Sequence, residues 1–348
     1  PALQSTLEVH YATEQAIEGL RGLILNTGSA LIGAAAIVTS LVLFAMQVNI
    51  ERMPHGLFRR LSADLKLLGA FALAFLLAIG VATLSTFVDQ ARLAHVVLAT
   101  SWAVGFILIS FMYAYRRALV LINPLQQLGI LIQDTRKELW TWTRRAQRAM
   151  PLLEREEPAS ATSSPTDSTH EFARTAFFQI NNRWTDGAKR AIRHAMSFAR
   201  RYAEQGDHEV SGAALNAVIG INAAYIESKG KTFYANTPFV DNPLSSDSFI
   251  NDTLEHLRQN VQSGIARRDE QQIEQTLQTM AALVQVYLGI DYSSPYAAKS
   301  HAQLAAGYLA SAVQTVVPHD MADVLLEGQR LMGQSARYIL AHGDPNDI

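Results

Sequence analysis

Cysteine is absent from this 348-residue chain. Its absence excludes disulfide bonds, thiolate metal sites and a cysteine nucleophile, and it fits a reducing compartment. An excess of one charge is missing too, because 29 Lys and Arg residues oppose 31 Asp and Glu residues. Domains that bind nucleic acid carry a clear basic excess. We therefore do not expect nucleic acid among the partners of this protein.

Recognisable catalytic and metal-binding patterns are also missing. None of the ten histidines has another histidine four residues away, the spacing that places two ligands on one helical face. The segment 228–232 (SKGKT) ends like a phosphate-binding loop, but Tyr225 stands where that loop needs its first glycine. A helical pattern, not a strand, precedes it. The sequence therefore predicts no enzyme, with no catalytic residue, metal or cofactor.

Three long runs lack any charged side chain or histidine, at 22–50, 67–88 and 96–115. A helix needs about 20 apolar residues to cross a hydrocarbon core about 30 Å thick. The sequence therefore predicts three membrane spans, at about 22–48, 67–88 and 95–115. They form a membrane domain of 22–117, which follows an extracytoplasmic segment of 1–21. Spans without charge argue against ion-coupled transport and leave passive conduction or simple anchoring open.

Basic residues around the spans predict their orientation. The loop between the first two spans carries four, the loop between the second and third carries only Arg92, and two more follow the third span. Since cytoplasmic loops are enriched in Lys and Arg, the loop 51–66 and everything after residue 116 are expected in the cytoplasm. The basic residues expected at the membrane surface are Arg52, Arg59, Arg60, Lys66, Arg116 and Arg117.

Two stripes of small side chains mark the first two spans. In the second span an alanine recurs every four residues, which lets another helix approach closely and predicts a helix-packing strip of Ala70, Ala74, Ala78 and Ala82. In the first span one helical face is small or polar, with Asn26, Ser29, Gly33, Ser40 and Gln47. Two interpretations of this face remain open: it packs against another helix, or it lines a wet pore in an oligomer.

Asn123 and Pro124 interrupt the helix that continues from the third span. A juxtamembrane helix is expected within 118–153, with the apolar spacing of three and four that a helical seam requires. It either lies on the membrane, with Trp140 and Trp142 among the headgroups, or forms a self-associating stalk, which its narrow seam favours. Small polar residues and prolines predict a flexible linker at 154–170.

Residues 171–348 have helical apolar spacing almost throughout and predict a cytoplasmic all-α domain, either a bundle or an irregular α-solenoid. Asp247 and Asp320 are expected N-caps. Uncharged runs at 210–226 and 302–318 indicate central helices that are buried on all sides. The irregular segment 231–250 is either a binding loop or a plain connection. Helices are predicted at 171–205, 209–228, 247–267, 269–289, 296–316 and 320–341.

A sequence pattern near the first loop carries a family resemblance. The run 43–47 (LFAMQ) is followed by 53–58 (MPHGLF) and then by Asp64. Over 23–81 this pattern resembles a family of predicted bacterial inner-membrane proteins known only as a domain of unknown function. In that family serine and arginine flank the proline, whereas this chain has Met53 and His55. The resemblance implies a bacterial inner membrane and allows one more span upstream, and it implies no activity.

Together these features predict a multi-pass protein of the bacterial inner membrane. The expected partners are the lipid bilayer, further copies of the chain in a homo-oligomer, and a protein bound by the cytoplasmic domain. That domain is expected to serve interaction or sensing. The alternative is a passive ion channel, with the polar face of the first span lining the pore.

Overall fold

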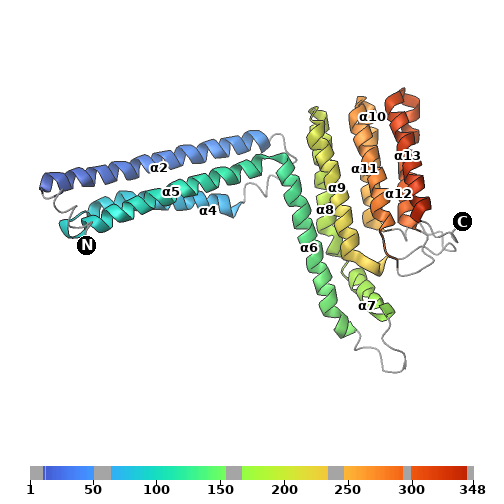
Figure 1. Cartoon of the computed structure of the whole chain (residues 1–348), viewed down its shortest axis with the longest axis horizontal. Helices are drawn as coiled ribbons and strands as arrows, with labels where there is room; N and C mark the ends of the chain where they lie inside the picture. The colour runs from blue at the N-terminus through green and yellow to red at the C-terminus, as the bar shows by residue number, and fades with distance from the viewer. Residues whose placement is uncertain are drawn as a thin grey trace. The chain divides into compact units, whose positions relative to one another are not determined.

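The computed structural model describes residue 11 and residues 13–50, 64–153, 167–233, 247–292 and 299–342. Within these residues every regular element is a helix, apart from a single isolated bridge between Phe233 and Tyr292. The predicted all-α class is therefore confirmed. The chain divides into two compact units, residues 1–124 and 125–348 (Figure 1). Each unit is described below by itself.

The first unit consists of three long helices, α2 (Glu14–Ile50), α4 (Leu65–Leu84) and α5 (Leu93–Ile122). Two short 3-10 turns, η1 (Ser85–Phe87) and η2 (Gln90–Arg92), connect α4 to α5. Long apolar segments qualify all three as candidate membrane spans, at 14–45, 65–87 and 90–121. The first begins eight residues earlier than predicted, because the helix already includes part of the segment 1–21.

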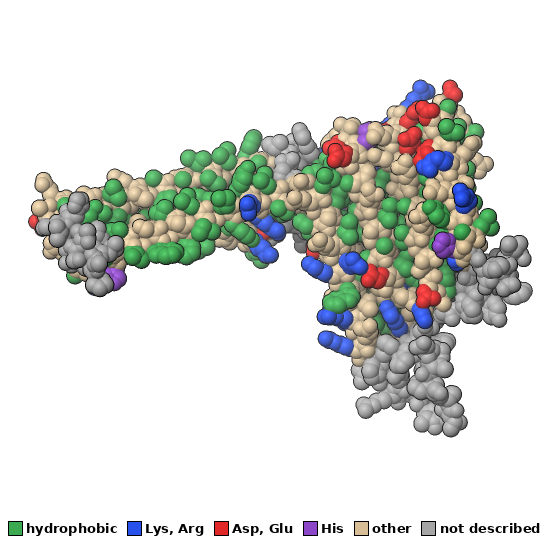
Figure 2. All heavy atoms as spheres, viewed as in Figure 1, with side chains coloured by type: hydrophobic (Ala, Val, Ile, Leu, Met, Phe, Trp, Pro, Cys, Tyr) green, Lys and Arg blue, Asp and Glu red, His purple; other side chains and the backbone are tan. Residues whose placement is uncertain are grey.

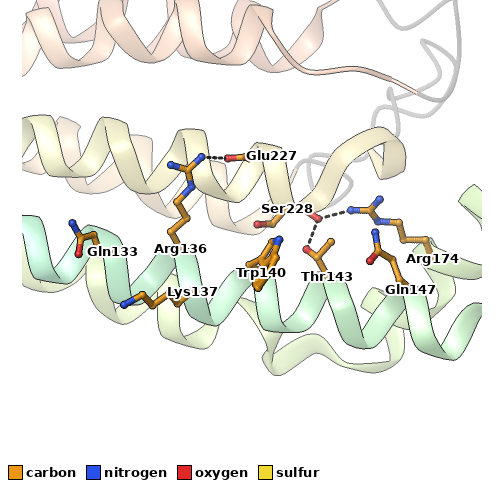
Figure 3. Close-up of a pocket in the computed structure, with 9 residues that line it drawn as sticks. All are labelled: Gln133, Arg136, Lys137, Trp140, Thr143, Gln147, Arg174, Glu227 and Ser228. Carbon is orange, nitrogen blue, oxygen red and sulfur yellow. Dashed lines mark hydrogen bonds and ion pairs between the residues drawn. The ribbon is translucent and has the colours of Figure 1, made fainter.

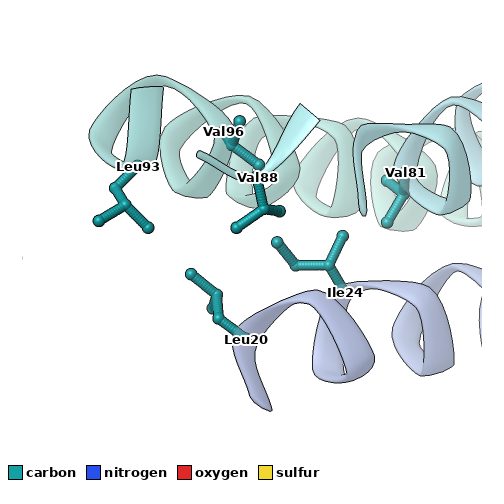
Figure 4. Close-up of a cluster of buried hydrophobic side chains, with 6 residues drawn as sticks. All are labelled: Leu20, Ile24, Val81, Val88, Leu93 and Val96. Carbon is teal, nitrogen blue, oxygen red and sulfur yellow. The ribbon is translucent and has the colours of Figure 1, made fainter. Parts of the chain in front are cut away.

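Two clusters of apolar side chains hold the three helices together. Near the start of α2, Leu20 and Ile24 pack against Val81 of α4 and Leu93 of α5 (Figure 4). Further along, Ala74, Ala78 and Ile107 form a second cluster. On the face shown in Figure 2, hydrophobic side chains also cover the outside of this unit. An apolar exterior around a small internal core is what a lipid environment requires.

The second unit begins with α6 (Pro124–Leu153), which follows the extended residue Asn123. The buried seam of α6 includes Leu128, Leu139 and Ala146. Ile132 packs over Gly220, where an added Cβ would meet it at 3.6 Å. The apolar seam of α6, which the sequence assigned to a self-associating stalk, thus packs against the other helices of the second unit. This finding corrects the stalk interpretation, since no apolar stripe is left on that face to pair with a second copy.

Three antiparallel helix pairs build the rest of the unit. They are α8 (Asp186–Glu204) with α9 (His208–Lys229), α10 (Ser248–Arg267) with α11 (Glu270–Leu288), and α12 (Ser300–Val316) with α13 (Ala322–His342). Successive pairs stack so that α9, α11 and α13 form one layer and α8, α10 and α12 form another (Figure 1). Of the two predicted arrangements, this stack matches the irregular α-solenoid.

Aspartates begin several of these helices, as local sequence signals predict. Asp207 and Asp269 accept hydrogen bonds from Val210 N and Gln272 N. Asp247 caps α10, as predicted. Asp320 does not behave as expected: it adopts a left-handed conformation at the end of η7 (Val317–His319), and α13 begins at Ala322. A free side-chain oxygen lowers the energy of either conformation, so composition alone does not choose between them.

Two predictions within this domain are wrong in detail. The single helix expected at 171–205 is divided into α7 (Asp167–Ile180), the short turn η4 (Asn182–Thr185) and α8. Helix α7 ends where the Asn181 backbone leaves the helical region (φ −98°, ψ 54°), and the Asn181 side chain donates to Phe177 O at 2.9 Å beside its own backbone N–H. The run 302–318 was expected to be buried on all sides, but α12 is exposed along one face, at Gln303, Ala310 and Gln314, because it lies in the last pair of the stack.

Of the predicted linker, 167–170 belong to α7 and 154–166 lie outside the described residues.

Candidate functional site

The polar face of α2 points away from its neighbours in the first unit. All five residues of the predicted pore lining, Asn26, Ser29, Gly33, Ser40 and Gln47, are exposed. The buried face of the helix, which includes Leu20, Ile24 and Ala35, lies roughly 150° around the helix axis from them. Asn26 and Gln47 make no hydrogen bond to any described residue. The first unit therefore leaves this stripe uncovered.

Exposed residues on the other two helices are different in kind. Those on α4 include Leu68, Leu76 and Ile79, and those on α5 include Phe106 and Ile109. Ser101 is exposed, but its hydroxyl donates a hydrogen bond to Val97 O, one turn back, at 2.8 Å, so it needs no polar partner outside the helix. Such surfaces suit lipid, whereas an amide side chain in hydrocarbon loses its hydrogen bonds to water. Between the charged residues near the helix ends, the α2 stripe is the described surface of these helices that places amide and hydroxyl side chains among apolar ones.

The alanine strip of α4 lies inside the unit. Ala70, Ala74 and Ala78 are buried where α4 meets the other two helices. Ser110 of α5 donates to the carbonyl oxygen of Ala70 at 2.8 Å. At Ala82 the backbones of α2 and α4 come so close that a Cβ on Gly28 would lie 2.5 Å from Ala82 N. The strip thus serves packing within one chain.

The basic residues expected at the membrane surface have different environments. Arg52, Arg59 and Arg60 lie outside the described residues, and Lys66 and Arg116 are exposed. Arg117 pairs with Asp64, the N-cap of α4, at 2.6 Å between Nη2 and Oδ2. Partial burial raises the pKa of Asp64, but the bond from Arg117 and the backbone N–H groups outweigh it, so the pKa is lowered. This pair joins the start of α4 to the last turns of α5.

The second unit contains a buried cluster of ionic and phenolic groups, which we call the Asp247 cluster: Asp247, Lys229, Tyr225, Asn222 and Tyr287. The Asp247 side chain is 6% exposed and forms an ion pair with Lys229, the last residue of α9. It also accepts a hydrogen bond from the Tyr225 hydroxyl at 2.7 Å and caps α10. Next to it, Tyr287 of α11 donates to Asn222 Oδ1 at 2.8 Å. Three helices meet at this point.

Aromatic rings surround the Asp247 cluster. The Tyr225 ring stacks on Trp184 at 5.2 Å and packs against Phe249 at 4.2 Å between centroids. Trp184 comes from η4, which explains why the chain leaves the helix there: the turn delivers the indole into the core. A second set of rings lies beside the cluster. The Tyr292 hydroxyl is 2.7 Å from His301 Nδ1, and the Phe233 ring packs on both His301 and Tyr225.

The electrostatics of the cluster favour fixed charges. Burial alone raises the pKa of Asp247, but the charge and hydrogen bond of Lys229 and the bond from Tyr225 lower it. Burial, with the Asp247 charge, raises the pKa of Tyr225 well above its ordinary value. At neutral pH the carboxylate is therefore ionised and the phenol protonated. Such an arrangement holds elements together and offers no reactive group to solvent.

The Asp247 cluster was missed in the sequence, although two of its signals were visible. Tyr225 and Lys229 stand four residues apart on one helical face, and Asp247 has the position of an N-cap. The predicted binding loop 231–250 touches the cluster at both described ends, since Phe233, Phe249 and Ile250 are buried. Residues 234–246 lie outside the described part of the chain. Helix α9 runs into the segment 228–232 and ends at Lys229, where a phosphate-binding loop needs a preceding strand, which further argues against such a loop.

No protein-family model matches this chain, and no curated protein or solved structure matches it either. Its function has to be inferred from its own residues.

Proposed function

We propose that this protein is a homo-oligomer of the bacterial inner membrane, in which the polar faces of α2 from neighbouring copies meet. The observation that carries the proposal is the uncovered stripe of Asn26, Ser29, Ser40 and Gln47 on an otherwise apolar exterior. Lipid cannot satisfy these side chains, and another copy of the same helix can. Gly33 at the centre of the stripe lets two backbones approach, because nothing lies within 4 Å of its Cβ position.

The placement of the second unit in the cytoplasm is part of this proposal. Its support is the basic enrichment of the 51–66 loop and of the residues after the third span. The resemblance over 23–81 supports the bacterial inner membrane. In this role the stacked helix pairs serve as an interaction or sensing module, as extended helical stacks commonly do, and not as an enzyme. The groups of the Asp247 cluster are engaged with one another, which supports a structural role for them.

The absence of cysteine allows a direct test in membranes. Single cysteines are introduced at Ser29 or Ser40, and membranes are treated with an oxidant or a short bismaleimide. We expect cross-linked dimers, because side chains at the contact come within disulfide reach of about 4 Å between Cβ atoms. Matched controls are Leu76→Cys on α4 and Ile109→Cys on α5, which are exposed on apolar faces and should remain monomeric. Equal cross-linking at all four positions would refute the α2 contact.

A passive channel is the second candidate, because the same stripe offers hydroxyl and amide groups along one face. If several α2 helices surround an axis, these groups face water instead of one another. Ion flux into liposomes should then appear with the wild-type chain and fall with Ser40→Leu, while Ser29→Cys cross-linking persists. Flux that is absent from wild-type liposomes excludes the channel and leaves the oligomer proposal intact.

A further inference from the structure

A groove in the second unit has a lining that neither the α2 contact nor the Asp247 cluster explains. It has a volume of about 620 Å³ and lies between α6, α7 and the C-terminal end of α9 (Figure 3). Helix α6 contributes a second stripe, which lies on a different face from its buried seam. The members of this stripe recur at intervals of three and four residues and so share one helical face: Gln133, Lys137, Trp140, Thr143 and Gln147.

The lining is rich in hydrogen-bond donors and positive charge. Arg136, Lys137 and Arg174 contribute three cations, and Glu227 is the only acidic residue among the lining residues. Glu227 is already paired with Arg136, at 2.7 Å. The ammonium of Lys137 and the side chains of Gln133 and Gln147 make no hydrogen bond to any described residue. The Lys137 ammonium is therefore unpaired among the described residues, and the two neutral amides have donor and acceptor atoms free for a ligand.

The negative end of α9 does not neutralise this charge. Its Ser228 carbonyl accepts a hydrogen bond from Thr143 at 3.1 Å and another from Arg174 at 2.6 Å (Figure 3). These two bonds fix α6 and α7 against the end of α9, so the walls of the groove are held by three separate helices. A preformed donor-lined groove is typical of a ligand site.

The ring of Trp140 gives the groove an apolar wall. It is 53% exposed, which is costly for so large an apolar side chain. The Arg144 guanidinium lies 3.4 Å from the ring centroid and fixes the indole by a cation–π contact. A flat aromatic wall beside several donors is the combination that binds a phosphate joined to an organic group, because phosphate accepts many hydrogen bonds and the organic part stacks or packs on the ring.

We propose that this groove binds an organic phosphate, with the phosphate at Arg136, Lys137 and Gln133 and the organic part against Trp140. Two sources have this chemistry, a soluble nucleotide and the headgroup of an acidic phospholipid. The proposal gives the sensing module a ligand. It does not depend on whether the α2 faces meet, so either proposal can fail without the other.

The test is a calorimetric titration of the full chain in phosphatidylcholine nanodiscs. The probes are ATP, inorganic tripolyphosphate and a water-soluble short-chain phosphatidylglycerol. We expect ATP or the lipid probe to bind, and Lys137→Gln to weaken that binding about tenfold through the lost charge-assisted contact. Trp140→Ala should weaken the organic probe about tenfold and leave tripolyphosphate unchanged. The better of the two organic probes identifies the source.

Arg337→Gln on α13 is the matched control, because it removes one positive charge from an exposed position outside the groove. Its affinity for every probe should equal that of the wild type. Three results would overturn the proposal: neither organic probe binds, Lys137→Gln binds no more weakly than Arg337→Gln, or Trp140→Ala leaves the organic probes unaffected. All of these side chains are exposed, so the variants are expected to fold normally.

Discussion

Substituting Asp247 with asparagine removes one negative charge and keeps the shape of the side chain. Asparagine caps helices about as well as aspartate, so the bonds from Phe249 N and Ile250 N are expected to survive. The counter-charge of Lys229 is lost, and that side chain is only 18% exposed. Removing one partner of a buried ion pair costs about 3–5 kcal/mol, because the other charge remains buried.

The environment of Lys229 places the expected cost at the low end of this range. Its ammonium also lies 4.1 Å from the centroid of Phe233, a contact that the variant retains. We expect Asp247→Asn to lower the free energy of unfolding by about 3 kcal/mol, which is about 6–12 °C in melting temperature for a domain of this size. Lys229→Met is the matched variant. It leaves Asp247 bonded to Tyr225 and two backbone N–H groups, so we expect a cost of only about 1–2 kcal/mol.

Hydrogen exchange of the full chain in nanodiscs, read by mass spectrometry at the start of α10, measures these costs locally. The pH dependence adds a check. Since the pKa of Asp247 is lowered on folding, its contribution is complete at neutral pH and is lost as the pH falls through the folded pKa. The gap between wild type and Asp247→Asn should therefore close in acid. A variant within about 1 kcal/mol of wild type at neutral pH, or a larger cost for Lys229→Met, contradicts this account of the cluster.

Two further substitutions test packing and protonation elsewhere. Gly28→Ala should destabilise the first unit by about 1–3 kcal/mol, because its Cβ meets the Ala82 backbone, whereas Gly69→Ala on α4 faces open space outside the proposed α2 contact and should be neutral; thermal denaturation in detergent compares them. Burial, with Lys229, lowers the pKa of His301 despite the opposing charge of Asp247, so the neutral ring is favoured on folding and stability should fall as the pH drops below about 6.5. His301→Gln should lose this dependence, whose slope is at most about 1.4 kcal/mol per pH unit; melting curves between about pH 7.5 and 5.5 measure it.

The fold class was predictable because its strongest determinants are local. Long runs without charge mark the three membrane-length helices, and Asn123 with Pro124 marks the end of α5. The division of 171–205 was not predictable from periodicity, because the apolar spacing continues through η4. The division depends on Trp184, which finds a stacking partner in Tyr225, a residue 41 positions further along the chain. Tertiary contacts of this kind override local helix preference.

The candidate sites also differ in whether local sequence alone can predict them. The sequence identified the α2 stripe and the alanine strip by composition, but both have small side chains at helical spacing and look alike. The structure distinguishes the two stripes, since Ala74 and Ala78 are buried within the unit while Asn26 and Ser40 are exposed. The Asp247–Lys229 pair was hidden for another reason: the two residues are 18 positions apart in the sequence. Only the fold brings their charges together.

The polar side chains of the α2 stripe limit the free energy of association of the proposed contact between α2 helices. Hydrogen bonds between membrane helices contribute about 0.6 kcal/mol each on average. Four polar side chains, at Asn26, Ser29, Ser40 and Gln47, therefore supply roughly 2–3 kcal/mol per helix, which favours association without making it permanent. A contact of this strength responds to whatever else brings copies together. If the second unit binds a ligand that changes how its copies associate, a gain of about 1.4 kcal/mol shifts the association equilibrium tenfold. In the proposed homo-oligomer, such weak polar contacts between the spans let ligand binding to the second unit shift the association equilibrium.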